Sequence, residues 1–167
     1  INPRKLEPKL ERELLESGIT KDLQKFLNYF SVSRDQAKEL VEHNYAGWVV
    51  PYRDPSGKPY EHNGKPFYRL KPDSGQLTGD KPPKYLSPKD GGCRPYLSPL
   101  LDREILLNAN KQIIFGEAEK KADASNASGF TTIGLAGVDC WTDGRTEKGE
   151  MLPELQKIPW KSRKICP

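Results

Sequence analysis

Residues 111–137, KQIIFGEAEKKADASNASGFTTIGLAG, contain the pattern that decides the fold. Two apolar runs, at residues 113–115 and 131–135, flank a stretch of charged residues and alanines that Gly129 closes. β-branched and aromatic residues favour strands, and a glycine just after a helix supplies its C-terminal cap. The pattern predicts a strand, a helix and a second strand that form a parallel βαβ unit.

Glu117 follows the first of these predicted strands, and Lys120 and Lys121 lie one turn into the helix. Functional side chains in α/β folds gather at the carboxyl ends of the strands. A carboxylate there can bind a divalent metal or transfer a proton, so Glu117 is the candidate catalytic and metal-binding residue. Lys120 and Lys121 can contact phosphate and are candidates for nucleic-acid binding, with a solvated helix face as the alternative.

Residues 113–124, IIFGEAEKKADA, resemble the TEGEKKA signature of a TOPRIM-like domain of uncharacterised function. The segments that extend the resemblance occur in the expected order and are SGI at 17–19, YRLKPD at 68–73, KYLSPKDG at 84–91 and IGLAGV at 133–138. Such domains are found in plasmid- and phage-borne bacterial proteins, often beside primase or helicase modules. The resemblance implies a role in DNA replication of a mobile element, through primase-type, metal-dependent nucleotidyl transfer.

TOPRIM domains are implied to hold magnesium with a Glu after the first strand, here Glu117, and an Asp-x-Asp after a later one. No Asp-x-Asp follows Glu117, and residues 163–166, RKIC, predict the beginning of the strand that would lead to it. We therefore expect half of a magnesium site and no catalysis by this chain alone. Ala118 replaces the Gly of the signature, so the flexible position of the turn is expected at Gly116 instead.

Three segments follow from the pattern along the chain. Residues 1–45 are predicted to form a helical unit, with N-caps at Thr20 and Ser33. Residues 46–105 contain ten of the fifteen prolines and are predicted to form short β-strands. Residues 106–167 are the TOPRIM-like βαβ part, apparently truncated before the Asp-x-Asp. The expected fold class is α/β, or α+β.

The middle segment is the basic part of the chain, with nine Lys or Arg against five Asp or Glu between residues 53 and 94. Aromatic residues alternate with these charges, which is typical of a groove for single-stranded nucleic acid. Arg69, Lys71, Lys84 and Tyr85 are the candidate contacts. The alternative is that the aromatic residues form a small core and the lysines solvate the loops.

Composition sets the remaining limits. The net charge of +4 permits a nucleic-acid partner, and 35% apolar residues predict a small core. The chain has no apolar run long enough to cross a membrane and no signal-peptide core, which favours the cytoplasm. Three widely spaced cysteines, Cys93, Cys140 and Cys166, favour free thiols over a disulfide framework.

Two functions beside the enzyme stay open. One is a non-catalytic module that binds single-stranded nucleic acid or assembles with other proteins. The other is a structural fragment whose function lies beyond residue 167. The expected partners are single-stranded DNA and helicase or primase modules.

Overall fold

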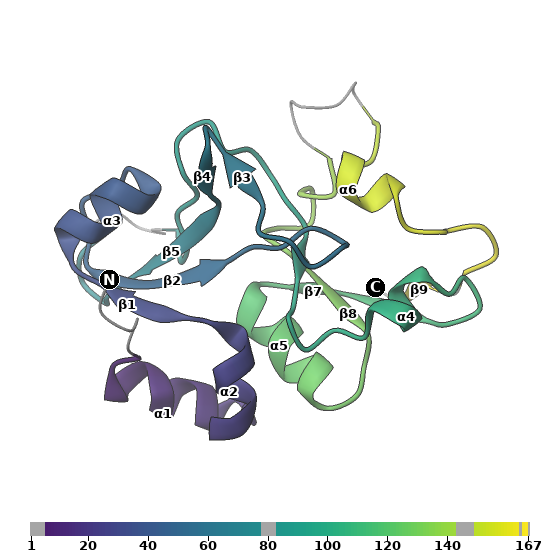
Figure 1. Ribbon diagram of the computed structural model, residues 1–167, viewed down its shortest axis with the longest axis horizontal. Coiled ribbons are helices and arrows are strands. Elements are labelled where there is room, and N and C mark those ends of the chain that lie inside the picture. Colours follow the sequence, from purple (N-terminus) through teal and green to yellow (C-terminus); the bar gives the residue numbers. More distant parts are fainter. Residues whose placement is uncertain (1–5, 78–82, 143–148, 164, 167) are drawn as a thin grey trace.

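The computed structural model describes residues 6–77, 83–142 and 149–163, and the backbone of 165–166. Helices and sheets are mixed in one α/β structure, as the sequence predicts (Figure 1). In chain order the elements are α1 (Pro8–Glu16), α2 (Lys21–Leu27), β1 (Phe30–Val32), α3 (Arg34–Val41), β2 (Gly47–Pro51), β3 (Glu61–His62), β4 (Lys65–Pro66), β5 (Tyr68–Pro72), β6 (Tyr96–Leu97), α4 (Arg103–Leu107), β7 (Ile113–Glu117), α5 (Glu119–Ala127), β8 (Thr132–Leu135), α6 (Pro153–Gln156) and β9 (Ile165–Cys166).

The first sheet has the order β1-β2-β5, with both neighbouring pairs antiparallel. It joins the first two predicted segments, because β1 comes from residues 1–45 and pairs with β2. Phe30, which belongs to the predicted helical unit of residues 1–45, lies instead in β1 opposite Val49. The helix ends earlier because Asn28, its C-cap, adopts the left-handed conformation at φ 56°.

The predicted helix caps of the first segment are confirmed. Thr20 Oγ1 accepts a hydrogen bond from the backbone N–H of Leu23 at 3.4 Å and begins α2. Ser33 and Gln36 form a reciprocal capping box that begins α3, with bonds of 3.3 and 2.9 Å. Local signals alone therefore determine where these two helices begin.

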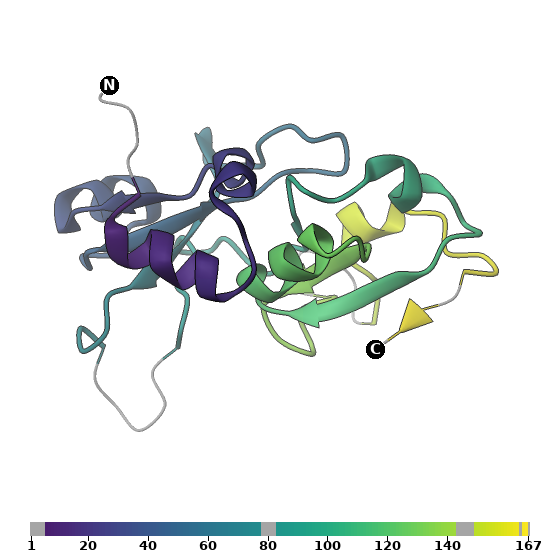
Figure 2. The same ribbon diagram turned by 90° about the horizontal axis from the view of Figure 1, so that it is seen from below.

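The second sheet has the order β6-β8-β7-β9 and contains the predicted βαβ unit. β7 is parallel to both β8 and β9, whereas β6 is antiparallel to β8. α5 covers one face of the β7–β8 pair (Figure 2). The approach is close, since a Cβ on Gly134 of β8 would lie 3.3 Å from the Cβ of Ala122. The small side chain of Ala122 permits this approach.

The turn between β7 and α5 has its unusual backbone at Ala118, with φ 69° and ψ 154°. Gly116 lies within β7, opposite Gly134, and is not among the glycines with positive φ. The expectation that the flexible position had moved to Gly116 is therefore wrong. The turn geometry holds position 118 because its N–H donates to the carbonyl of Leu135 at 2.9 Å. Alanine thus adopts a conformation that normally requires glycine.

Ala118→Gly is expected to raise the free energy of unfolding by about 1 kcal/mol, because relief of backbone strain exceeds the entropic cost of glycine. Equilibrium unfolding in urea measures the change. Ala124→Gly, in the middle of α5, is the matched control and should lower stability by about 1 kcal/mol. If Ala118→Gly lowered stability as much as the control does, the backbone of Ala118 would not be strained.

Cys93 and Cys140 form a disulfide, with their Cα atoms 5.4 Å apart. The expectation of free thiols is wrong for this pair. The bond ties the segment before β6 to the loop after β8, two regions that the second sheet brings together. Spacing could not reveal the pair because the two cysteines are 47 residues apart in the sequence.

Candidate functional site

Glu117 and Glu119 lie on either side of the β7–α5 turn in opposite environments. The Glu117 side chain is 69% exposed, and its carboxylate lies 3.9 Å from Nζ of the equally exposed Lys121. Such a pair contributes little to stability. Glu119 is only 1% exposed. The candidate residue Glu117 is therefore open to solvent, whereas the second glutamate of the motif belongs to the interior.

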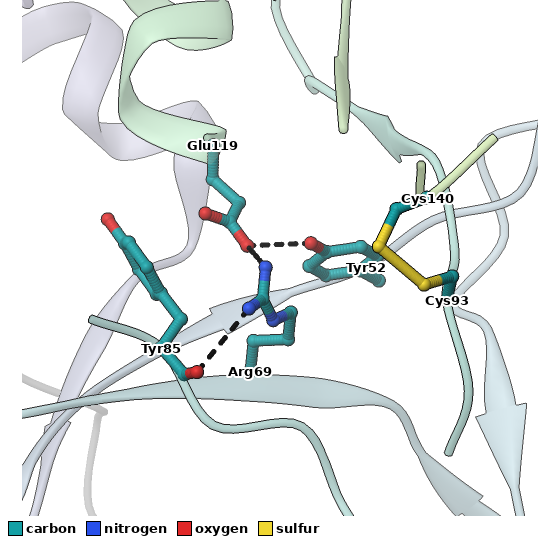
Figure 3. Close-up of a disulfide and its surroundings, with 6 residues drawn as sticks. All are labelled: Tyr52, Arg69, Tyr85, Cys93, Glu119 and Cys140. Atoms are coloured by element: carbon teal, nitrogen blue, oxygen red, sulfur yellow. Dashed lines mark hydrogen bonds and ion pairs between the residues drawn. A yellow bond between two sulfur atoms is a disulfide. The ribbon is translucent and has the colours of Figure 1, made fainter. Parts of the chain in front are cut away.

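Glu119 is the acceptor in a buried ion pair (Figure 3). Its Oε1 accepts hydrogen bonds from Tyr52 Oη at 2.7 Å and from Arg69 Nη1 at 2.6 Å. Arg69 Nη2 also donates to the carbonyl of Tyr85 at 3.4 Å. Burial lowers the pKa of Arg69, but Tyr52 and Glu119 outweigh it and raise that pKa overall. The Arg69 side chain, at 11% exposure, is thus a core cation rather than a surface one.

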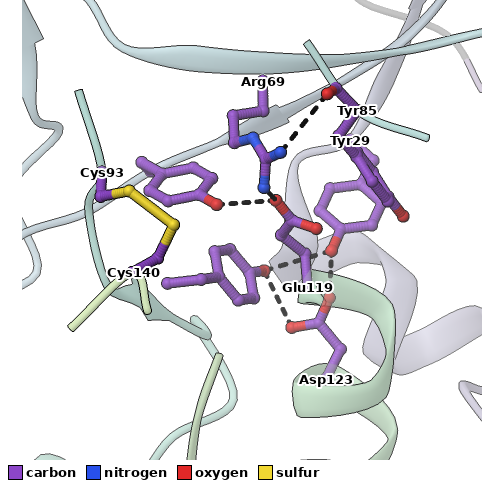
Figure 4. A network of polar contacts seen from close by, with 9 residues as sticks. Tyr29, Arg69, Tyr85, Cys93, Glu119, Asp123 and Cys140 are labelled. Atoms are coloured by element: carbon purple, nitrogen blue, oxygen red, sulfur yellow. Dashed lines mark hydrogen bonds and ion pairs between the residues drawn. A yellow bond between two sulfur atoms is a disulfide. The ribbon is translucent and has the colours of Figure 1, made fainter. Parts of the chain in front are cut away.

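Asp123 is buried one turn further along α5 and binds two tyrosines (Figure 4). Its Oδ1 accepts from Tyr96 Oη at 2.8 Å, and its Oδ2 accepts from Tyr29 Oη. Burial raises the pKa of Asp123 to about 7, although hydrogen bonds from Ser98 and both tyrosines lower it. A carboxyl group that changes its charge near neutral pH therefore lies in the centre of the structure.

The two carboxylates of α5 connect the two sheets. Tyr52 and Arg69 belong to the β2 and β5 region of the first sheet, and Tyr96 is in β6 of the second. In Figure 3 the Tyr52 ring lies between Glu119 and the Cys93–Cys140 disulfide. The polar face of α5 thus serves as an attachment for distant segments.

The free energy of unfolding should fall as the pH rises from about 4 to about 7. The folded pKa of Asp123 is about 7 and its ordinary value is 3.8. Folding therefore favours the protonated form of Asp123. The stabilisation from this protonation is complete below about pH 4 and is lost as the pH rises through about 7. A fall of at least about 1.4 kcal/mol, one pKa unit, is expected in urea unfolding. Asp123→Asn should remove this slope, and an equally steep slope in that variant would assign the effect to another group.

Lys71 and Lys120, both predicted to contact nucleic acid, share one partner. Glu13 Oε1 accepts hydrogen bonds from Lys71 Nζ and from Lys120 Nζ, the latter at 2.9 Å. Burial raises the pKa of Glu13, but the two lysines outweigh it and lower that pKa overall. A phosphate at either lysine would have to compete with the Glu13 carboxylate.

The remaining candidates divide by exposure. Lys84 and Lys121 are exposed. Tyr85 is partly buried, with the Arg69 guanidinium 5.3 Å from its ring centroid and the Trp48 ring at its edge. The neighbouring aromatic residues of the middle segment are buried, namely Tyr60, Phe67 and Tyr68. For these residues the structure matches the alternative in which the aromatic side chains form a small core.

The described residues do not complete a magnesium site. Glu117 offers one carboxylate, whereas the Glu and the Asp-x-Asp that the family resemblance implies would together offer three. No group of three or more His, Cys, Asp or Glu side chains in the described part of the chain could hold a metal ion.

The sequence pattern did not single out Glu119 and Asp123, nor the tyrosines that bind them. The available signal was the composition of α5, EKKADASNA, in which alanine is the only apolar residue. A helix that covers a sheet with so few apolar residues must bury polar ones. Positions 119, 122, 123 and 126 have the spacing of one helix face, and all four are buried.

Comparison with known proteins gives one family match. A family model described as a domain of unknown function (DUF3854) matches residues 103–166, which include β7, α5, β8 and β9. No curated protein and no solved structure matches the chain. Within the described residues, no helix is both long enough and apolar enough to span a membrane.

Proposed function

We propose that this chain is part of a nucleic-acid-associated, TOPRIM-like domain of a plasmid or phage replication protein. Primase-type, metal-dependent nucleotidyl transfer is the proposed activity, with Glu117 as its catalytic carboxylate. The observation that supports it is the exposed carboxylate at the carboxyl end of β7, the strand between β8 and β9. Three parallel strands end at the same edge of a sheet, where α/β folds place their functional residues.

The direction of β9 adds support. Ile113 pairs with Ile165 and Ile114 with Cys166, so β9 is parallel to β7 and lies beside the first residues of that strand. A strand that continues beyond Cys166 in this register runs toward the edge that holds Glu117. An Asp-x-Asp after that strand, as the family resemblance implies, would lie beside Glu117 and supply the missing carboxylates.

The proposed nucleic-acid contacts are Lys84 and Lys121, which are exposed. Lys71 and Lys120 are proposed to contribute only after release from Glu13, and Arg69 only if its buried pair with Glu119 opens. The partner proposed from the basic middle segment is single-stranded DNA.

Binding of a labelled oligo(dT) strand tests the proposal. Affinity should fall steeply between about 50 and 200 mM salt, since phosphate contacts release counterions. Lys121→Gln and Lys84→Gln should each reduce the salt slope by about 1. Lys38→Gln, at an exposed lysine of α3, is the control and should leave the slope unchanged. Affinity that does not depend on salt would exclude a phosphate-binding role.

A non-catalytic binding module is the second candidate. It is favoured by the buried Glu119 and Asp123, because α5 uses these carboxylates to attach other segments. Glu117→Ala in the full-length protein separates the two. Under the first proposal it abolishes metal-dependent nucleotidyl transfer, and under the second it leaves oligo(dT) affinity as the sole activity, little changed.

A further inference from the structure

Two guanidinium groups from distant segments lie against one turn after β2. Arg53 Nη1 donates to the carbonyl of Gly57 at 3.0 Å. Nε of Arg103, the first residue of α4, lies 3.2 Å from the position that a Cβ on Gly57 would occupy. Gly57 has φ +89°, and its N–H donates to the carbonyl of Asp54 at 2.9 Å, which closes the turn. The absence of a side chain at Gly57 leaves room for the second arginine.

Several N–H donors of this pair have no acceptor. Nε of Arg53 and both Nε and Nη2 of Arg103 are buried without a hydrogen-bond partner. In the described part of the chain no carboxylate forms an ion pair with either arginine. Oδ1 of the nearby Asp54 accepts instead from Ser56 Oγ and the N–H of Lys58. Buried donors without partners are costly and rare in native structures.

The charges around the turn are mainly positive. Burial lowers the pKa of Arg103, and the neighbouring Arg53 lowers it further, whereas Asp54 opposes both. Lys157 is close enough to Asp54 to act on its carboxylate. Arg103 therefore has a second guanidinium and one carboxylate as charged neighbours, and Oδ1 of that carboxylate is occupied by the turn, so an added anion would be stabilised.

Space for a ligand adjoins Arg53. A pocket of about 300 Å³ is lined by Arg53 together with Pro51, Pro59, Phe67 and Tyr68, among other residues. This volume is at the lower end of the range for small-molecule sites. Arg53 therefore both lines this pocket and, through its guanidinium, contacts the Gly57 turn.

We propose that Arg53 and Arg103 bind a phosphate group, from a nucleotide or from the backbone of a nucleic-acid strand. The planar guanidinium presents paired donors that match phosphate oxygens, and the N–H groups without partners would receive acceptors. The site lies on other residues than Glu117, Lys84 and Lys121, so it does not rest on the function proposed above.

Calorimetric titration of the full chain with inorganic phosphate, at constant ionic strength, tests the site. Arg103→Gln and Arg53→Gln should each weaken phosphate binding about tenfold, the loss of one charge-assisted hydrogen bond. Arg34→Gln, an exposed arginine of α3, is the matched control and should change affinity less than about twofold. Absence of phosphate binding by the wild type, or equal losses in all three variants, would overturn the proposal.

Two further readouts identify the ligand and exclude a merely structural role. If Arg103→Gln also weakens oligo(dT) binding, the ligand is the phosphate backbone of a nucleic-acid strand. If the variant weakens only the binding of inorganic phosphate, the ligand is a free nucleotide or phosphate. In phosphate-free buffer Arg103→Gln should melt at or above the wild-type temperature, because it removes a buried cation without a partner. A lower melting temperature together with unchanged phosphate affinity would assign Arg103 to structure alone.

Discussion

Glu119→Gln is expected to lower the free energy of unfolding by about 3–5 kcal/mol, the cost of removing one partner of a buried ion pair. Arg69 would keep its charge at 11% exposure and lose its carboxylate. Tyr52 would lose a charged acceptor at 2.7 Å. Equilibrium unfolding in urea, followed by the fluorescence of the three tryptophans, measures the change.

Glu117→Gln is the matched control, since the same substitution two residues earlier affects a side chain that is 69% exposed. It should change the free energy of unfolding by no more than about 0.5 kcal/mol. Arg69→Met combined with Glu119→Gln should recover part of the loss, because both buried charges are then removed. Equal stabilities of the two single Glu variants would contradict the buried pair.

Reduction of the Cys93–Cys140 disulfide is expected to lower stability by up to about 4 kcal/mol, from the entropy of a loop of this length. The two cysteines are 47 residues apart, and the loop between them contains β6, α4, β7, α5 and β8. The unfolded chain gains this freedom when the bond opens, whereas the folded sheet still holds the two segments together. Urea unfolding with and without a reductant gives the difference.

The double variant Cys93→Ala, Cys140→Ala should be as unstable as the reduced wild type and should not respond to reductant. A reductant effect that persists in this variant would have another origin. An identical unfolding midpoint for oxidised and reduced wild type would contradict a stabilising disulfide.

Much of the fold follows from local sequence signals. The apolar runs on either side of the alanine-rich stretch predict β7, α5 and β8. The parallel pairing of β7 with β8 follows because the helix between them returns the chain to the end of the sheet where β7 begins. The caps at Thr20 and Ser33 predict where two helices begin. These predictions succeed because each depends on neighbouring residues, whose backbone preferences the tertiary structure preserves at these positions.

Predictions about individual side chains depended on contacts that are distant in sequence. Lys71 and Lys120 resemble phosphate ligands in the sequence, yet Glu13 binds both of them. Arg69 lies in a basic segment, yet its partner is a buried carboxylate 50 residues away. Charge type is visible in the sequence, but whether a charge meets solvent or a partner is determined by packing.

The sequence by itself determined the βαβ unit, the helix caps and the position of Glu117 at the end of β7. The tertiary structure alone decided that Glu119 and Asp123 are buried and that Cys93 meets Cys140. It also decided that Ala118 takes a glycine conformation. The physical reason is the distance along the chain over which each interaction acts. Strands, helices and caps arise from preferences within a few residues. Burial, pairing and backbone strain arise only when distant segments pack together.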